Sequence, residues 1–186
     1  MQNSASTILA LIVAGVLLFI VPVVTLTDRS DNVTQENVKL IVEQFVTEVR
    51  NTGKITRAQF QDFRNELEAT GNISYNIDIE LKFLDENPGK KTAQANYTKI
   101  GENLYYSEYT TQVLKRLGIK SDDQAVNSTD DTIFLKEGDY ISVQVKNDDK
   151  TPAQTVKSSL FRVSNSDEYV IYAQSSGMVT VNGEKD

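Results

Sequence analysis

The chain has 186 residues and a formal net charge of −7, and it contains neither cysteine nor histidine. These counts exclude disulfide bonds, thiol or imidazole nucleophiles and bases, and zinc sites built from those side chains. An acidic chain repels the phosphates of nucleic acids, so we expect no nucleic-acid partner.

The first element in chain order is an apolar segment, residues 8–26, which reads ILALIVAGVLLFIVPVVTL. A helix of about 20 apolar residues spans the hydrocarbon core of a bilayer. Residues 1–7 contain no Lys or Arg, and no Ala-x-Ala site follows the segment, so a retained anchor is favoured over a cleaved signal peptide. We predict a transmembrane anchor at residues 1–27 and one α+β domain at residues 28–186.

Two features bear on the orientation of this anchor. Arg29 follows the apolar segment whereas the N-terminal tip carries no Lys or Arg, which favours an external N-terminus under the positive-inside rule. A short tip before a large polar domain is instead typical of an exported, signal-anchored protein. We expect the second arrangement, a single-pass membrane protein with its C-terminal domain outside the cell membrane.

The anchor helix is predicted to run into an amphipathic helix that follows it almost at once. Asn32 and Gln35 have the spacing of a capping box, Pro22 is expected to kink the preceding membrane helix, and Gly53 is expected to end the new helix. Apolar residues at spacings of three and four form its inner stripe: Val38, Ile41, Val42, Phe45, Val46 and Val49.

A second helix follows after a short connection. Thr56 and Gln59 form its capping box, and Gly71 is expected to end it. Its inner face consists of Phe60, Phe63 and Leu67. Residues 53–56 are interpreted as a tight helix–helix connection, in preference to a recognition turn.

The rest of the domain is predicted to be a small, mainly antiparallel sheet with one or two short helices. Strict alternation predicts half-buried strands at residues 73–83 and 141–145. Further strands are predicted to begin at Ile133 and to cover residues 169–172, and residues 177–181 are read as a last hairpin arm. One short helix is predicted at about 108–117, and another opens at Thr151 and Pro152, with Ala153, Val156 and Leu160 facing inward.

Several polar and aromatic clusters are candidate sites, and each has a simpler structural explanation. Asp122, Asp123, Asn127, Asp130 and Asp131 lack the EF-hand spacing, so a solvated acidic loop is favoured over a calcium site. The adjacent pairs 122–123, 130–131 and 148–149 also lie in predicted loops, and no serine or threonine has a suitable base nearby. We therefore predict no catalytic, cofactor-binding or metal-binding residues, and no enzyme activity.

The layout resembles a small family of membrane-anchored proteins encoded with tight-adherence (Tad) pilus and secretion systems of Firmicutes. The matching stretches are SASTILALIVAGVLLFIVPV, QFVTEVRNTGKITRAQFQDFRNELEATGN, LKEGDYISVQVKNDDKTPAQTVKSSLF and SSGMV. The resemblance implies a minor-pilin-like accessory role at the cell envelope. Processed type IV pilins have a basic leader and a Glu near the new N-terminus, and this chain has neither, so leader-peptidase processing is not expected.

Two classes of function remain after this reading. The first is a non-catalytic structural component of a pilus-like or secretion assembly, which would pack against other subunits or itself through the N-terminal helices. Small residues in those helices, Ala5, Ala10, Ala14 and Gly15, would allow close approach. The alternative is a membrane-tethered binding module for a protein, peptide or glycan, using the tyrosine-rich region from Tyr97 to Tyr109.

Overall fold

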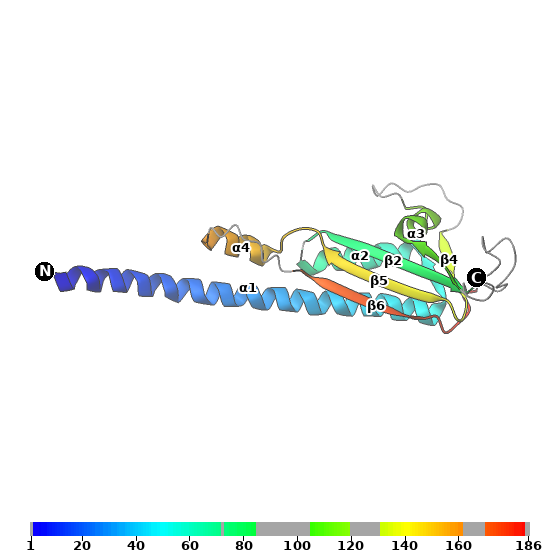
Figure 1. Ribbon diagram of the computed structural model, residues 1–186, viewed down its shortest axis with the longest axis horizontal. Helices are drawn as coiled ribbons and strands as arrows, with labels where there is room; N and C mark the ends of the chain where they lie inside the picture. The colour runs from blue at the N-terminus through cyan, green and yellow to red at the C-terminus, as the bar shows by residue number, and fades with distance from the viewer. Residues whose placement is uncertain (1, 72, 85–104, 120–130, 162–169, 185–186) are drawn as a thin grey trace, which may run out of the picture.

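A computed structural model describes residues 2–71, 73–84, 105–119, 131–161 and 170–184, which form a long helix with an α+β head at one end (Figure 1). The dominant element is α1 (Gln2–Thr52), a single helix of 51 residues. Its N-terminal end projects beyond the other elements, and its C-terminal half lies along a sheet. The fold class is α+β, as predicted.

The apolar helix runs directly into the amphipathic one, as predicted, but the predicted helix start at Asn32 is wrong, because α1 passes through Pro22 and Asn32 without interruption. Asn32 is therefore no N-cap, and Gln35 contacts the sheet instead of the helix start. The Thr34 hydroxyl donates a hydrogen bond to the carbonyl of Ser30 at 3.0 Å, so this hydroxyl has its partner within the same helix. A capping box contributes only about 1 kcal/mol, less than the packing that this segment gains as a continuous helix.

The main sheet has four antiparallel strands in the order β3-β2-β5-β6. These strands are β2 (Tyr75–Leu84), β3 (Tyr105–Tyr109), β5 (Tyr140–Asn147) and β6 (Tyr172–Met178). The predicted alternation in β2 and β5 is confirmed, with Leu81 paired to Ile141 and both fully buried. The inner face of the sheet packs on the helices, and Figure 1 views the molecule with β2, β5 and β6 in front of α2.

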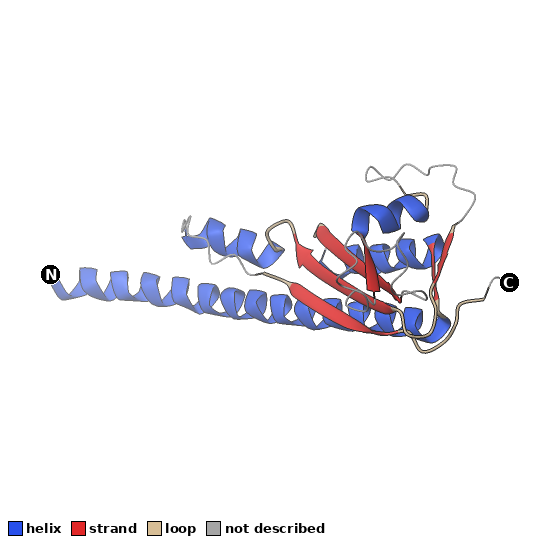
Figure 2. Ribbon diagram, turned by 45° about the vertical axis from the view of Figure 1, so that its right-hand side comes forward, coloured by secondary structure: helices blue, strands red, loops and turns tan. Residues whose placement is uncertain are grey.

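The remaining elements complete the head around this sheet. They are β1 (Lys54–Thr56), α2 (Arg57–Gly71), α3 (Thr110–Arg116), β4 (Thr132–Phe134) and α4 (Pro152–Phe161). Residues 54–56, predicted as a plain connection, pair antiparallel with β4. Figure 2 shows α4 beyond the end of the sheet, beside the projecting part of α1.

The core lies between the inner face of the sheet and the helices α1, α2 and α3. The predicted inner stripe of α1 is confirmed, since all its members are buried except Ile41, which is partly buried. The rings of Phe45 on α1 and Phe63 on α2 stack at 4.3 Å between centroids, which joins the two helices. The other large buried side chains include Ile55, Leu67, Ile79, Leu117, Ile133, Leu135 and Ile171.

Two capping boxes start helices where the sequence predicts them. The backbone N–H of Gln59 donates to the hydroxyl of Thr56 at 3.1 Å, and the N–H of Thr56 donates to the Gln59 side chain at 2.9 Å. Thr151 and Gln154 make the same reciprocal pair at the start of α4, at 3.1 and 2.9 Å.

Three predictions near the C-terminus are wrong. The last strand covers Tyr172–Met178 rather than 169–172, and it continues where a separate hairpin arm was expected. Its run of Gln, Ser and Gly carries little strand signal, but it pairs with β5 along its full length and lies against α1. In α4, Ala153 is buried but Val156 is 39% exposed, and the Leu160 side chain lies outside the described residues.

Three segments meet at Gly53, the residue that follows α1. Gly53 has φ 64°, the left-handed conformation expected of a helix C-cap, and its N–H donates to the carbonyl of Val49. Its carbonyl accepts the N–H of Leu135, and the Leu135 carbonyl accepts the N–H of Gly183. A Cβ added to Gly53 would lie only 2.5 Å from the backbone nitrogen of Gly183.

We predict that Gly53→Ala lowers the free energy of unfolding of the head by about 2–4 kcal/mol, because it combines positive-φ strain with a backbone clash. Gly15→Ala is the matched control, since a Cβ at Gly15 meets no atom within 4 Å. Urea unfolding of the full chain in detergent micelles measures both. Equal midpoints for the two variants would contradict the close contact at Gly53.

Candidate functional site

The largest exposed apolar surface of the described chain is the apolar segment of α1, residues 8–26. Among the described residues, one helix, α1, is long and apolar enough to cross a membrane, and none of its most apolar stretch is buried against the head. Leu11 and Phe19 are 73% and 75% exposed. Side chains of this kind require lipid or other apolar side chains around them.

The exposure of α1 falls in a regular order toward the head. Ile20, Val24 and Thr27 are partly buried, and Asp31 and Thr34 are buried. These positions recur at spacings of three and four, so one stripe passes from the end of the apolar segment into the buried stripe of the head. The segment and the head therefore share one unbroken helix surface.

Two side chains on α1 hold the edge of the sheet. The Gln35 amide donates to the carbonyl of Tyr172 at 2.6 Å and accepts the N–H of Tyr172 at 3.0 Å. At the other end of β6, Arg50 Nε donates to the carbonyl of Met178 at 2.9 Å. Gly177 leaves the space for Arg50, because a Cβ there would lie 2.5 Å from Arg50 Nε.

The spacing of these contacts fits the geometry of both elements. Gln35 and Arg50 lie about 22 Å apart along a helix that rises about 1.5 Å per residue. Tyr172 and Met178 lie about 20 Å apart along a strand that rises about 3.4 Å per residue. Sequence reasoning missed these residues, and the one available signal was the place of Gln35 at the border of the apolar stripe.

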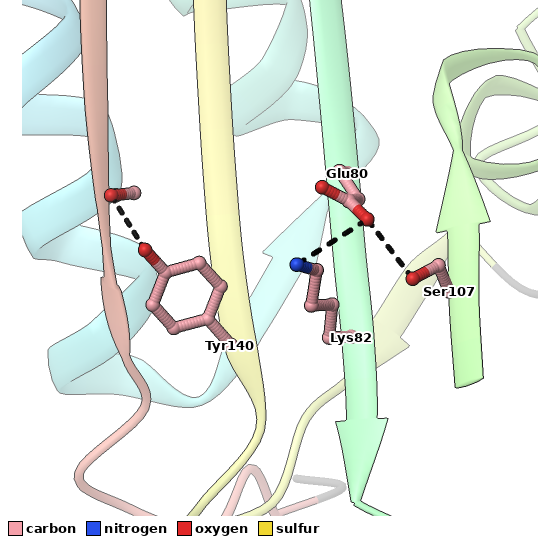
Figure 3. Close-up of polar contacts among 5 residues, drawn as sticks. Glu80, Lys82, Ser107 and Tyr140 are labelled. Carbon is pink, nitrogen blue, oxygen red and sulfur yellow. Dashed lines mark hydrogen bonds and ion pairs between the residues drawn. The ribbon is translucent and has the colours of Figure 1, made fainter. Parts of the chain in front are cut away.

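The outer face of the sheet, the side away from the helices, carries mainly polar side chains (Figure 3). The Ser107 hydroxyl donates to Glu80 at 3.0 Å, and Lys82 lies 3.6 Å from the same carboxylate oxygen. The Tyr140 hydroxyl donates to Ser176 at 2.7 Å. The contacts of Ser107 with Glu80 and of Tyr140 with Ser176 join neighbouring strands, whereas Lys82 and Glu80 pair within β2.

The tyrosines of the predicted binding region divide between the two faces of the sheet. Tyr105 and Tyr109 are 40% and 60% exposed and share the outer face of β3 with Ser107. Tyr106 points to the opposite side, where its ring stacks on Phe83 at 5.1 Å. The described tyrosines therefore do not form one continuous patch, and Tyr97 lies outside the described residues.

The candidate carboxylates that the structure describes fall into two separate segments, Asp131 before β4 and the pair Asp148 and Asp149 after β5. Asp131 is ion-paired with Arg57 at 2.6 Å, and its backbone carbonyl accepts the Arg57 N–H. Asp148 and Asp149 are exposed in the loop between β5 and α4. Asp122, Asp123, Asn127 and Asp130 lie outside the described residues. Within the described ranges, no group of three or more acidic side chains is arranged to hold a metal ion.

Among the described residues, the pKa of one side chain on the inner face of the sheet, Tyr75, is shifted. Burial raises the pKa of the Tyr75 phenol above its ordinary value of 10.0, and the hydrogen bond to Thr70 at 3.2 Å partly offsets this rise. Thr70 also donates to the carbonyl of Leu67, so Tyr75 closes the end of α2. This is a packing role, because Tyr75 lies against the core.

Comparison with known proteins adds no assignment. No protein-family model, no curated protein sequence and no solved structure matches the chain. The features of the chain that bear on function are therefore α1, its apolar segment and the way in which the head is attached to it.

We predict that Gln35→Glu weakens the attachment of β6, because a carboxylate accepts the Tyr172 N–H but cannot donate to its carbonyl. The loss should be about 1–3 kcal/mol and should appear as faster hydrogen exchange at the Tyr172 amide. Gln61→Glu, an exposed exchange of the same type on α2, is the control. Unchanged exchange at Tyr172 in the Gln35 variant would contradict this role.

We also predict that Tyr75 makes stability fall at alkaline pH. Above about pH 10 the unfolded chain releases the phenol proton while the folded chain still holds it, so the free energy of unfolding falls as pH rises. Tyr75→Phe should reduce the difference between urea midpoints measured at about pH 8 and about pH 10.5. Tyr109→Phe, which alters an exposed ring, should leave that difference unchanged.

Proposed function

We propose that this chain is a non-catalytic, membrane-anchored structural or accessory subunit of a pilus-like or secretion assembly at the bacterial cell surface, with residues 28–186 outside. The observation that carries the proposal is the unbroken α1, which is apolar and exposed at one end and embedded in the head at the other. A head held on such a helix has a fixed position above the membrane. The resemblance to Tad-associated proteins supports the same proposal.

The continuous helix α1 also suits a transfer of the apolar segment from lipid into contact with other helices. Apart from the Leu18 carbonyl, to which Pro22 offers no N–H, the apolar segment can make its backbone hydrogen bonds inside the helix, so its sides are suited to lipid or to neighbouring apolar helices. The polar contacts of Gln35 and Arg50 lie outside this segment and do not change when its surroundings change. Movement from a bilayer into a helical assembly therefore needs no refolding of the head.

The binding module is the second candidate, and the exposed rings of Tyr105 and Tyr109 favour it. Their face also carries the contacts of Glu80, Lys82 and Ser107, which use much of its polar surface internally. The assembly subunit is preferred because the exposed apolar surface of α1 is larger and continuous with the core.

We predict that the full chain fractionates with membranes, resists extraction by high salt and dissolves in detergent. Replacing both Leu11 and Leu17 by Lys should shift it to the soluble fraction, because each central charge opposes insertion by about 3 kcal/mol. A cysteine at the exposed loop residue Lys150 should react with an impermeant maleimide added to intact cells. Labelling only after lysis would contradict the external head.

The assembly role has its own test. A tagged chain crosslinked in cells of its native host should capture subunits of a pilus or secretion assembly, and the double Leu→Lys variant should capture none. A chain that stays in the membrane and captures no assembly subunit would contradict the proposal.

A further inference from the structure

A second stripe on α1, distinct from the buried one, runs from the apolar segment into the head. Its members follow one another at spacings of four and three, they are all exposed, and none is charged. We call this stripe the seam: Ala5, Leu9, Ile12, Val16, Phe19, Val23, Leu26, Ser30, Val33, Asn37, Leu40 and Gln44.

The spacing of the seam is that of a coiled coil. Positions that recur every 3.5 residues on average stay in one line only when two helices wind around each other with a left-handed supercoil. In heptad terms, Val33 and Leu40 occupy d positions, and Asn37 between them occupies an a position. The charged neighbours Arg29 and Glu36 lie beside the seam and not in it.

The head leaves the seam open. At about 100° per residue, the seam lies roughly a third of a turn around α1 from the buried stripe that contains Val38 and Val42. Val33 and Leu40 are 50% and 54% exposed, whereas Val38, on the buried side of the same part of α1, is fully buried. Two helices joined along their seams would therefore carry their sheets on outward sides.

The seam is complementary to the same surface of a second copy of this chain. Two copies anchored in one membrane have the same direction and the same depth, so each seam residue faces its own counterpart. In such a parallel pair, apolar residues meet from Ala5 to Leu26, and Asn37 meets Asn37, whose amides donate and accept in turn. One Asn at an a position is a known determinant of register in two-stranded coiled coils.

We infer that a second copy of this chain packs along the seam, α1 against α1, parallel and in register from the apolar segment to about Gln44. This inference deepens the proposed function and rests on its membrane anchorage. It adds a specific partner surface, most of which outside the bilayer consists of Val33, Asn37 and Leu40.

The absence of natural cysteine permits a direct test. Val33→Cys and Leu40→Cys variants of the full chain are expressed alone in membranes and treated with a mild oxidant. In the pair, cysteines at these positions approach within the reach of a disulfide, which needs Cα atoms less than about 7 Å apart. Asn32→Cys and Lys39→Cys are matched controls, since each is exposed, adjacent in sequence and about 100° around the helix.

We expect disulfide-linked dimers at Val33 and Leu40 to exceed those at Asn32 and Lys39 by roughly tenfold, because only the seam positions bring Cα atoms within reach of a disulfide. Adding Leu40→Lys to the Val33→Cys chain should abolish the dimer, while protease resistance shows that its head stays folded. Equal dimer yields at all four positions, or a higher yield at the controls, would overturn the inference.

These results separate the inference from the proposed function. Seam crosslinks in a chain that captures no assembly subunit in its host would uphold the pair and overturn the assembly role. Capture of assembly subunits by a chain without seam crosslinks would overturn the pair alone.

Discussion

The attachment of strand β6 along α1 is the constraint on which the rest of the head depends. Gln35 holds one end of the strand and Arg50 holds the other, and Gly177 leaves the space that Arg50 needs. Because β6 pairs with β5, and β5 with β2, the position of the whole sheet follows from this edge. The core then forms in the space left between the sheet, α1 and α2.

The surface of α1 has three different environments along one uninterrupted backbone. One stripe is buried under the sheet, the apolar segment is exposed on all sides up to Phe19, and the uncharged seam connects the two regions on the open side. A helix that served only as a tether would need no apolar side chains such as Val33 and Leu40 outside the bilayer. Their presence is what suggests that α1 meets another helix as well as lipid.

Much of the architecture could be predicted from local patterns, and the errors have one origin. The stripe from Val38 to Val49, the alternation in β2 and β5, and the box of Thr56 with Gln59 are signals carried by neighbours in sequence. The cap predicted at Asn32 and the strand predicted at 169–172 failed because contacts distant in sequence decide those segments. Gln35 binds Tyr172, 137 positions away, and no local pattern contains that pair.

The parallel course of β6 and α1 has a mechanical consequence. A pulling force on the head, directed along the helix axis, loads the hydrogen bonds of Gln35 and Arg50 in shear and at the same time. The two bonds therefore share the load and do not break one after another. At the C-terminal end of α1, the carbonyl of Gly53 is hydrogen-bonded to Leu135, which in turn is hydrogen-bonded to Gly183. These bonds hold the end of the contact between α1 and β6 from which separation would otherwise start. A lengthwise load between the apolar end and the head would therefore be shared by both contacts at once.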